Sequence, residues 1–183
     1  MKIKRGTILL KRVAKQDIEL IRRWRNSETV SRFMEYREHI TEEMQQEWFR
    51  KIDTDNNLYF LIMSDHKSLG LIYGADINWE DKTVGNAGIF IAEEGDRESA
   101  YALEASVLLN DYAFSIGIET IFIKVLKDNR RAIAYNKLLG YALLDGQENA
   151  YNQNYFLSRE AYLNNRRKLV PLLKNTGDFH VIV

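Results

Sequence analysis

The segment from Gly85 to Leu109 has the residue types and spacing of an anion-binding strand, turn and helix. Residues 87–92 form a short apolar run that is typical of a buried strand, and a polar turn follows at residues 93–97. Small residues at Ala100 and Ala102 then begin a helix whose apolar positions recur at helical spacing. Because the first N–H groups of a helix lack partners within it and lie at its positive dipole end, this arrangement can bind a pyrophosphate. An ordinary strand and helix without a ligand is the alternative.

A second strand and helix follow directly. Ile118–Leu126 is another apolar run, and Asn129 is placed to cap a helix over residues 130–139. Gly140 predicts where that helix ends, because glycine readily adopts the left-handed conformation of a helix C-cap. Tyr135 lies on this helix, and its spacing alone favours a tyrosine that fills core space.

A motif across this second unit resembles the closing motif of the GNAT superfamily of acyl-CoA N-acyltransferases. It consists of Val125, Asn129, Ala132, Tyr135, Leu138, Gly140 and Tyr141. In that superfamily the preceding loop reads Arg-x-x-Gly-x-Gly, or ends in Ala, and binds the pyrophosphate of acetyl-CoA. The stretch Arg97-Glu98-Ser99-Ala100-Tyr101-Ala102 occupies that place here. The resemblance covers nearly the whole chain and implies an α/β (α+β) fold, with a mixed, mostly antiparallel sheet splayed at its middle and flanked by helices.

Ala100 departs from the superfamily pattern, which has glycine at this position. A left-handed conformation would cost an alanine about 1–2 kcal/mol, which is roughly a tenfold loss of affinity. Because the N–H donor of Ala100 is still present, we expect weaker cofactor binding rather than none.

The resemblance implies acetyl-CoA as co-substrate and no metal. Tyr135 would be the general acid, because a phenol of pKa about 10 stays protonated at neutral pH and can protonate a departing thiolate of similar basicity. Asn129 is fully explained as a helix cap, and a contact with the pantetheine arm would be an addition. Arg97 would pair with a phosphate, with an ordinary exposed arginine as the alternative. The implied cofactor contacts are Ile91, Ala92, Arg97, Glu98, Ala100, Tyr101, Ala102 and Asn129.

The general base is the least defined part of the predicted site. Asp76, at the end of its strand, is one candidate, and a turn-forming aspartate is the other interpretation. An acceptor amine with a pKa near ~8 is substantially neutral at pH 7, whereas a lysine-like amine of ~10.4 needs deprotonation. A weak base therefore suffices if the acceptor is an amino sugar or an α-amine.

The N-terminal helices predict where the amine acceptor binds. The runs Ile18-Glu-Leu-Ile, Trp24-Arg-Asn and Phe33-Met34 resemble, within the superfamily, the N-acetyltransferases of nucleotide-linked 4-amino sugars. A branch that acetylates ribosomal-protein or peptide N-termini shares similar starts and is the second interpretation. In the amino-sugar subgroup a histidine often stands on the third helix, where this chain reads Met44-Gln45-Gln46. The implied acceptor contacts are Arg25, Asn26, Phe33, Met34 and Tyr36, and Phe33, Tyr36 and Trp79 are each a stacking surface for a uracil or an ordinary core or rim residue.

The composition bears on the other classes of function. Lys plus Arg and Asp plus Glu both number 26 among 183 residues, so no broad basic field favours nucleic acid. There is no cysteine, and the histidines at positions 39, 66 and 180 lack metal-ligand spacing. The apolar run Thr7–Leu10 is too short for a signal peptide or a membrane span, so a cytoplasmic protein is expected.

The remaining elements follow from periodicity. One strand is expected over Ile3–Val13 at a sheet edge. Asp17 is expected to cap the first helix, a short second helix follows, and Thr41 is expected to cap the third helix. Strands are expected at residues 58–63, 69–76 and 84–92 as an antiparallel meander, and at 141–145 and 151–157 as a hairpin around Gly146.

We expect a single domain over residues 1–183, in which residues 162–183 form a C-terminal extension. Its apolar positions would pack on the core or on a second subunit of a homodimer. A non-catalytic acyl-CoA-binding regulatory module is the rival interpretation of a different class, motivated by Ala100 and by the weakly defined base.

Overall fold

The computed structural model describes residues 1–96 and 100–182, and the strands within them form one nine-stranded sheet. The strands are β1 (Lys2–Arg5), β2 (Ile8–Arg12), β3 (Leu58–Ser64), β4 (Lys67–Asn78), β5 (Thr83–Ile91), β6 (Thr120–Leu126), β7 (Ala142–Leu143), β8 (Asn152–Ser158) and β9 (His180–Ile182). Their order is β7-β8-β6-β5-β4-β3-β2-β1-β9. Neighbours are antiparallel, except that β5 and β6 are parallel. This mixed, mostly antiparallel sheet confirms the expected fold class.

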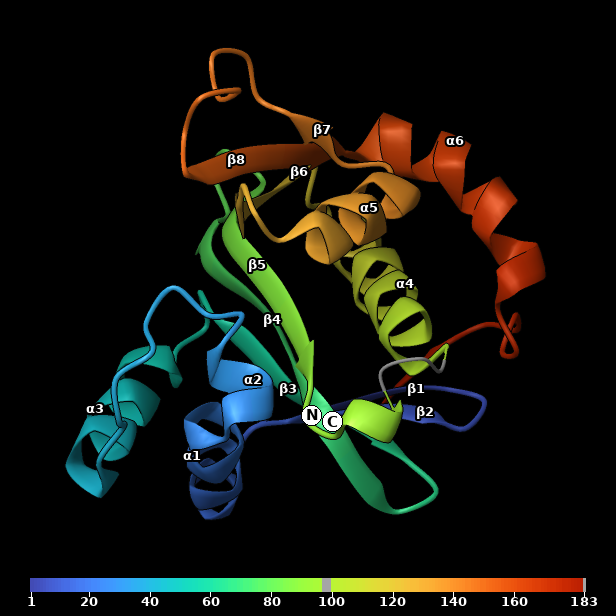
Figure 1. The fold of residues 1–183 in the computed structure, drawn as a ribbon. Coiled ribbons are helices and arrows are strands. Elements are labelled where there is room, and N and C mark those ends of the chain that lie inside the picture. The colour runs from blue at the N-terminus through green and yellow to red at the C-terminus, as the bar shows by residue number, and fades with distance from the viewer. Residues whose placement is uncertain (97–99, 183) are drawn as a thin grey trace.

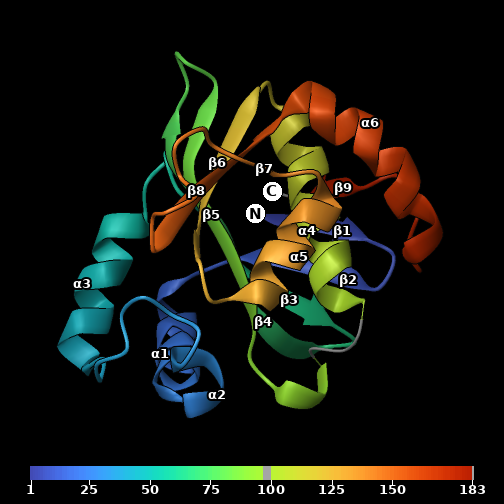
Figure 2. The ribbon, with the colours of Figure 1, turned by 45° about the horizontal axis from the view of Figure 1, so that its top comes forward.

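Helices cover both faces of the sheet, as Figure 1 and Figure 2 show. One face carries α1 (Ile18–Asn26), α2 (Glu28–Ser31) and α3 (Glu42–Ile52), and the other carries α4 (Tyr101–Ser115), α5 (Arg130–Leu139) and α6 (Arg159–Leu169). Short 3-10 turns lie at Lys15–Asp17, Glu94–Asp96 and Val170–Leu172. The sheet therefore has a core on each face: Phe60, Leu108 and Leu157 belong to the core under α4, and Ile21 and Leu71 to the core under α1.

Side-chain caps fix the starts of two helices that frame the site. Thr41 Oγ1 accepts the N–H of Met44 at 3.3 Å, and Asn129 Oδ1 accepts the N–H of Ala132 at 3.1 Å. Gly140 ends α5 with a φ of 102°, in the left-handed region that glycine tolerates. These three observations confirm the caps predicted from the sequence.

Two expectations for the N-terminal segment are wrong. Ile3–Val13 is not one edge strand, because Gly6, with a φ of 57°, turns the chain between β1 and β2, and β9 lies outside β1. Glycine adopts this conformation at little cost, and the alternating pattern around it does not reveal the turn. Asp17 does not cap α1 with its side chain, because its carboxylate accepts the N–H of Ala14 at 3.0 Å and Nζ–H of Lys11 at 2.8 Å instead.

The parallel strands β5 and β6 separate along their length. Their paired residues end with Ala87 and Ile123, whereas β5 continues to Ile91 and β6 to Leu126. On its other side β5 stays paired with β4 up to Ile91, so the opening lies between β5 and β6. The expected splay at the middle of the sheet is therefore confirmed.

The C-terminal residues pack on the chain itself. β9 pairs with β1, so that Ile3 lies opposite Val181, and Leu169 and Leu173 are buried in the core under α4. Asn175 lies against Gly6, where a side chain at position 6 would collide with it. Residues 162–182 therefore complete both the edge of the sheet and the core.

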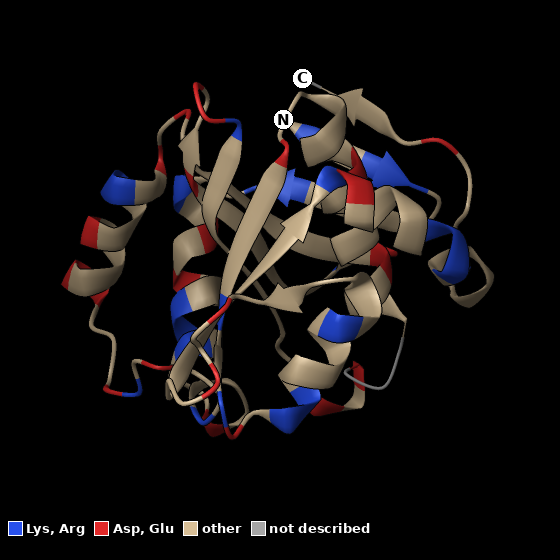
Figure 3. Cartoon of the chain, turned by 90° about the horizontal axis from the view of Figure 1, so that it is seen from above, with Lys and Arg blue, Asp and Glu red and all other residues tan. Residues whose placement is uncertain are grey.

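Charged residues of both signs are interspersed around the molecule (Figure 3). This distribution agrees with the equal numbers of acidic and basic residues. Within the described ranges no helix has the length and apolarity needed to cross a bilayer.

Candidate active site

The opening between β5 and β6 leads into a cavity of about 990 Å³. Residues of α4 and α5 line one end, residues of α1 and α3 line the other, and β5 from Asn86 to Ile91 lies between them. We call these the α4 end and the α1 end. Because the sheet is open here, ligands bound on its two faces can meet at β5.

The α4 end contains residues predicted to hold a cofactor. Ala100 has φ −72° and ψ −2°, an ordinary right-handed conformation, so the strain considered for an alanine at this position does not arise. Ala100 and Ala102 line the cavity, and Tyr101 packs against the core under α4. Arg97 and Glu98 lie outside the described residues.

Of the other predicted cofactor residues, two line the cavity and one does not. Ile91 and Asn129 line the cavity. Ala92 is not part of the lining, and its N–H donates to the carbonyl of Leu69 at 2.8 Å. The structure thus brings Ile91, Asn129, Ala100 and Ala102 to one space, and their contacts with a cofactor stay predictions.

Tyr135 lines the cavity from α5, with its hydroxyl bonded to α4. Oη lies 2.8 Å from the carbonyl oxygen of Ala102 and 2.7 Å from Oγ of Ser106. Burial raises the pKa of Tyr135 by more than the Ser106 hydrogen bond lowers it. The phenol is therefore protonated near neutral pH, as a general acid must be.

Arg25 brings a positive charge to the α1 end. Its Nε is buried and has no hydrogen-bond partner among the described residues, and the groups that act on its charge are the phenols of Tyr73 and Tyr59. Burial lowers the pKa of Arg25, but a guanidinium stays charged near neutral pH. The described residues supply no carboxylate partner for this charge, so the α1 end can accept an anion beside Arg25.

Aromatic side chains surround this charge. The rings of Tyr59 and Tyr73 stack with their centroids 4.8 Å apart, and Trp48 meets Tyr59 edge-on at 5.4 Å. Phe33 and Tyr36, which also line the cavity, each have an exposed fraction of 43%. The α1 end therefore offers flat apolar surfaces beside a guanidinium.

Four of the five predicted acceptor residues line this end. They are Arg25, Phe33, Met34 and Tyr36. Asn26 does not, because its side-chain amide bonds to the main chain of Ile40, accepting from N–H at 2.8 Å and donating to the carbonyl at 2.9 Å. Asn26 thus holds the segment that leads into α3, and its contact with a substrate stays a prediction.

Several lining residues were missed by the sequence analysis. Tyr59 and Tyr73 stand in register on β3 and β4, at positions where strand alternation faces them toward α1 and α3. Gln45, on the third helix where the amino-sugar subgroup often has histidine, is 4% exposed and its Nε2 has no partner within the described chain. For Tyr59 and Tyr73 the available signal was the period-two alternation of tyrosine with aliphatic residues along each strand.

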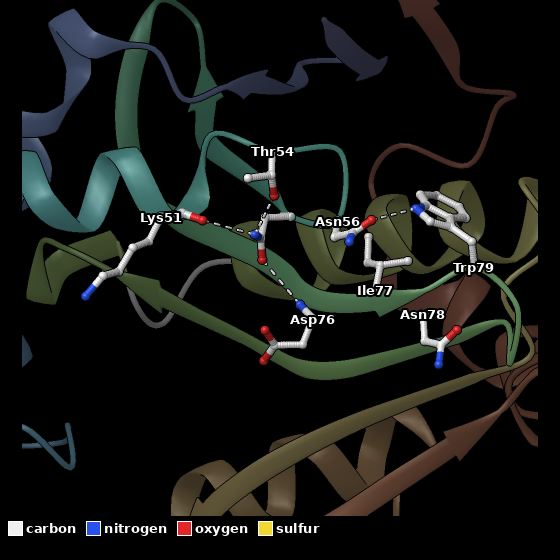
Figure 4. Close-up of a pocket in the computed structure, with 8 residues that line it drawn as sticks. Lys51, Thr54, Asn56, Asp76, Ile77, Asn78 and Trp79 are labelled. Carbon is white, nitrogen blue, oxygen red and sulfur yellow. Dashed lines mark hydrogen bonds between the residues drawn. The ribbon is translucent and has the colours of Figure 1, made fainter.

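Asp76 does not line the cavity. It has a φ of 55° and lies with Asn56, Asn57 and Trp79 around a separate surface hollow (Figure 4). Polar groups there bond to one another: Asn57 Oδ1 accepts the N–H of Asp76 at 3.2 Å, and Asn56 Oδ1 accepts Nε1–H of Trp79 at 3.1 Å. Asp76 raises the pKa of Tyr59 only as a lesser cause, after burial and Tyr73, and its role as a base stays a prediction.

A family model described as an acetyltransferase (GNAT) domain matches residues 10–156 of the chain. The chain belongs to the GNAT acetyltransferase family. As a GNAT protein it is an acyl-CoA-dependent N-acetyltransferase, which confirms the resemblance and the class of enzyme predicted from the motif around Tyr135.

Relatives of this GNAT protein agree with that assignment. The chain is 30% identical over 141 residues to acetyltransferase PseH of Campylobacter jejuni subsp. jejuni serotype O:2 (strain ATCC 700819 / NCTC 11168). The aligned region covers 74% of this chain and 83% of PseH. A solved structure of apo FdhC, a nucleotide-linked sugar GNAT, superposes on this chain with a TM-score of 0.75 at 22% identity. The superposed region covers 92% of this chain and 96% of FdhC. Spermidine N-acetyltransferase from Vibrio cholerae, solved with CoA and spermine, has a TM-score of 0.74 at 17% identity over 86% of this chain and 99% of that one. The two structures show that the fold is shared.

The α4 end of this GNAT cavity fits the co-substrate of the family. The first turn of α4 borders the cavity at Ala100 and Ala102, and Lys124 and Arg131 add positive charge to the lining. Phosphates are favoured by both features. Within the described residues no group of three or more His, Cys, Asp and Glu is placed to hold a metal ion.

Proposed function

We propose that this enzyme transfers the acetyl group of acetyl-CoA to a primary amine of a nucleotide-linked amino sugar. The similarity of the fold to FdhC, a nucleotide-linked sugar GNAT, supports this substrate class, as does the resemblance of the N-terminal motifs to amino-sugar N-acetyltransferases. Acetylation of a protein or peptide N-terminus is the alternative reaction, and binding of an acyl-CoA without catalysis is the alternative of another class.

The charge at the α1 end carries the proposal. Arg25 is half-buried there, and its buried Nε has no partner in the described chain. Glu35 is the only acidic residue among the described residues that line the cavity. A polyamine would meet Arg25 as a like charge, whereas a diphosphate would pair with it. Gln45 supplies a further buried donor, and the ring of Tyr36 can stack on a nucleobase.

The proposed reaction is a direct attack. The neutral amine nitrogen forms a bond with the thioester carbonyl carbon while the carbon–sulfur bond breaks. Tyr135 gives its phenolic proton to the departing sulfur, the new amide nitrogen releases a proton to water, and the phenolate regains one from water, so that charge balances. Main-chain N–H groups of β5 near Gly88 would stabilise the negative charge on the carbonyl oxygen. Binding both substrates across β5 would provide the larger part of the acceleration.

An acceptor screen tests this proposal. Thiol release from acetyl-CoA is measured with a nucleoside-diphosphate-linked 4-amino sugar, the free amino sugar, spermidine and a peptide with a free N-terminus. We expect kcat/KM for the nucleotide-linked sugar to exceed that for each other amine at least tenfold. Thiol release that is fastest with spermidine or the peptide would overturn the substrate class, and acetyl-CoA binding without thiol release from any amine would favour the regulatory module.

A pair of variants tests the role of Arg25. Arg25→Gln should raise KM for the nucleotide-linked acceptor about tenfold or more, because a charge-assisted contact is lost, and should leave KM for acetyl-CoA within about twofold. Arg23→Gln removes an exposed arginine from the same helix and is the matched control. Equal effects of the two substitutions would contradict an anion site at Arg25.

A further inference from the structure

The phenol of Tyr135 has two hydrogen-bond contacts on α4 but only one proton. The carbonyl oxygen of Ala102 accepts from the phenol at 2.8 Å, and a carbonyl can only accept. The phenol is also the donor to Oγ of Ser106, at 2.7 Å, so that its one proton is shared between two acceptors. Of these two partners only the Ser106 hydroxyl has a proton of its own, which it can donate to the phenolic oxygen once the phenolic proton has left. The phenol is therefore the donor in both contacts, and after proton loss its oxygen can accept a hydrogen bond only from Ser106 of these two partners.

Ser106 is well fixed for such a contact. It lies one helical turn after Ala102, and its exposed fraction is 6%. Burial limits competition from water for its hydroxyl, which strengthens the bond to Tyr135. The bond lowers the pKa of Tyr135 against the larger, opposite effect of burial.

We infer that Ser106 is a positioning residue for the general acid: its hydroxyl holds the oxygen of Tyr135 in place and stabilises the phenolate that forms when the proton leaves. This inference rests on the proposed role of Tyr135. Ser106 itself touches neither substrate nor co-substrate in the proposed reaction.

The geometry explains how the proton can be delivered without moving the ring. Rotation about the Cζ–Oη bond of Tyr135 turns the proton from the carbonyl of Ala102 toward the cavity, where the departing sulfur accepts it. As the proton leaves, the hydroxyl of Ser106 turns to donate to the same oxygen. After transfer the phenolate lies 2.8 Å from a carbonyl oxygen, which repels it, so the Ser106 donor is the contact that offsets this repulsion.

Ser106→Ala tests the inference directly. We expect kcat to fall about tenfold, the effect of losing one hydrogen bond to a charged group, with KM for acetyl-CoA and for the amine within about twofold. Ser115→Ala is the matched control, because Ser115 lies on the same helix and its hydroxyl donates to the carbonyl of Tyr112 at 2.7 Å. Its kcat should stay at the wild-type value. Ser106→Cys keeps the size of the side chain with a weaker donor and should give an intermediate kcat.

A double substitution separates positioning from packing. If Ser106 acts through the phenol, Ser106→Ala should slow wild-type enzyme but leave kcat unchanged in a Tyr135→Phe background. An equal loss in both backgrounds, or a wild-type kcat for Ser106→Ala, would overturn the role of Ser106 while leaving that of Tyr135 intact. Full activity of Tyr135→Phe alone would instead overturn the general acid and, with it, this inference. Thermal unfolding of each variant identifies any loss of activity that comes from loss of fold.

Discussion

The side-chain amide of Asn175 donates to a carboxylate oxygen of Glu104 at 2.8 Å. The other oxygen of Glu104 accepts the main-chain N–H groups of Lys174 at 2.6 Å and of Asn175 at 3.2 Å. Glu104 is two residues beyond Ala102 on α4 and is 5% exposed. The C-terminal segment is therefore bonded to the first turns of the helix whose start borders the α4 end of the cavity.

Glu104→Gln should destabilise the enzyme and weaken its binding of acetyl-CoA. An amide has one accepting oxygen in place of two, so at least one buried donor of the C-terminal segment loses its partner, at a cost of about 2 kcal/mol. Urea unfolding followed by circular dichroism measures the first effect, and calorimetric titration with acetyl-CoA the second. Glu80→Gln, in an exposed turn, is the control. Equal stability of the two variants would show that this bond does not hold the segment.

Tyr135→Phe should lower kcat by about tenfold or more, because the departing sulfur would then have to be protonated by water. KM for acetyl-CoA should change little, since the ring stays in place. Initial rates of thiol release at saturating amine give kcat. Tyr151→Phe, which alters a side chain with an exposed fraction of 61%, is the control. A Tyr135→Phe enzyme with wild-type turnover would exclude the phenol as the acid.

Gly88→Ala should disturb the α1 end. A Cβ at position 88 would lie 2.6 Å from the hydroxyl of Tyr73 and 2.8 Å from two of its ring carbons, so the ring of Tyr73 must shift from its position. We expect a loss of about 1–3 kcal/mol in the free energy of unfolding, as for other overpacked sites, and a higher KM for the amine. Gly177→Ala, which meets nothing within 4 Å, should change neither quantity. An unchanged KM for Gly88→Ala would place Tyr73 outside the acceptor site.

Asp111 should make the stability of the fold depend on acid pH. Burial raises the pKa of Asp111, but hydrogen bonds from Arg166, Tyr162 and Arg5 together outweigh burial, so its pKa lies below the ordinary value. A carboxyl with a lowered pKa in the folded state stabilises fully above the unfolded value of about 4 and loses that contribution as pH falls through its folded pKa.

Asp111→Asn should accordingly lower the free energy of unfolding by about 3 kcal/mol at pH 7, because the buried guanidinium of Arg5 and the half-buried guanidinium of Arg166 lose their counter-ion. The difference from wild type should shrink below about pH 4. Urea unfolding between pH 3 and pH 7 measures it, with the exposed Asp178→Asn as control. A difference that stays constant over this range would contradict the linkage.

Local signals in the sequence were sufficient for the elements around the site. Thr41 and Asn129 act on N–H groups three residues away, and Gly140 acts through its own backbone conformation, so each could be recognised without knowledge of the fold. The turn at Gly6 could not be recognised from local signals, because a glycine within an alternating run is equally compatible with a continuous strand and a turn.

The candidate site depended more on tertiary structure. Tyr135 could be singled out from its motif, but its contact with Ser106 joins residues 29 positions apart on different helices. Arg25 Nε and Gln45 Nε2 have no hydrogen-bond partner among the residues that the structure describes. This is a property of the assembled cavity, since any neighbouring side chain could have supplied a partner. A sequence lists the donors, whereas only the packing decides which of them are left for a ligand.

The outer edge of the sheet is built from the two extremes of the described chain. Lys2 lies opposite Ile182, and Figure 1 shows the N and C labels side by side. Among the strands of the described residues β1 is synthesised first and β9 last, so the outer backbone groups of β1 lack this strand partner until β9 has been made. An unfinished chain can be joined there by a strand of another nascent molecule. The pairing of β9 covers these groups and leaves a strand of only three residues, His180–Ile182, as the outer edge, which offers an incoming strand few backbone groups.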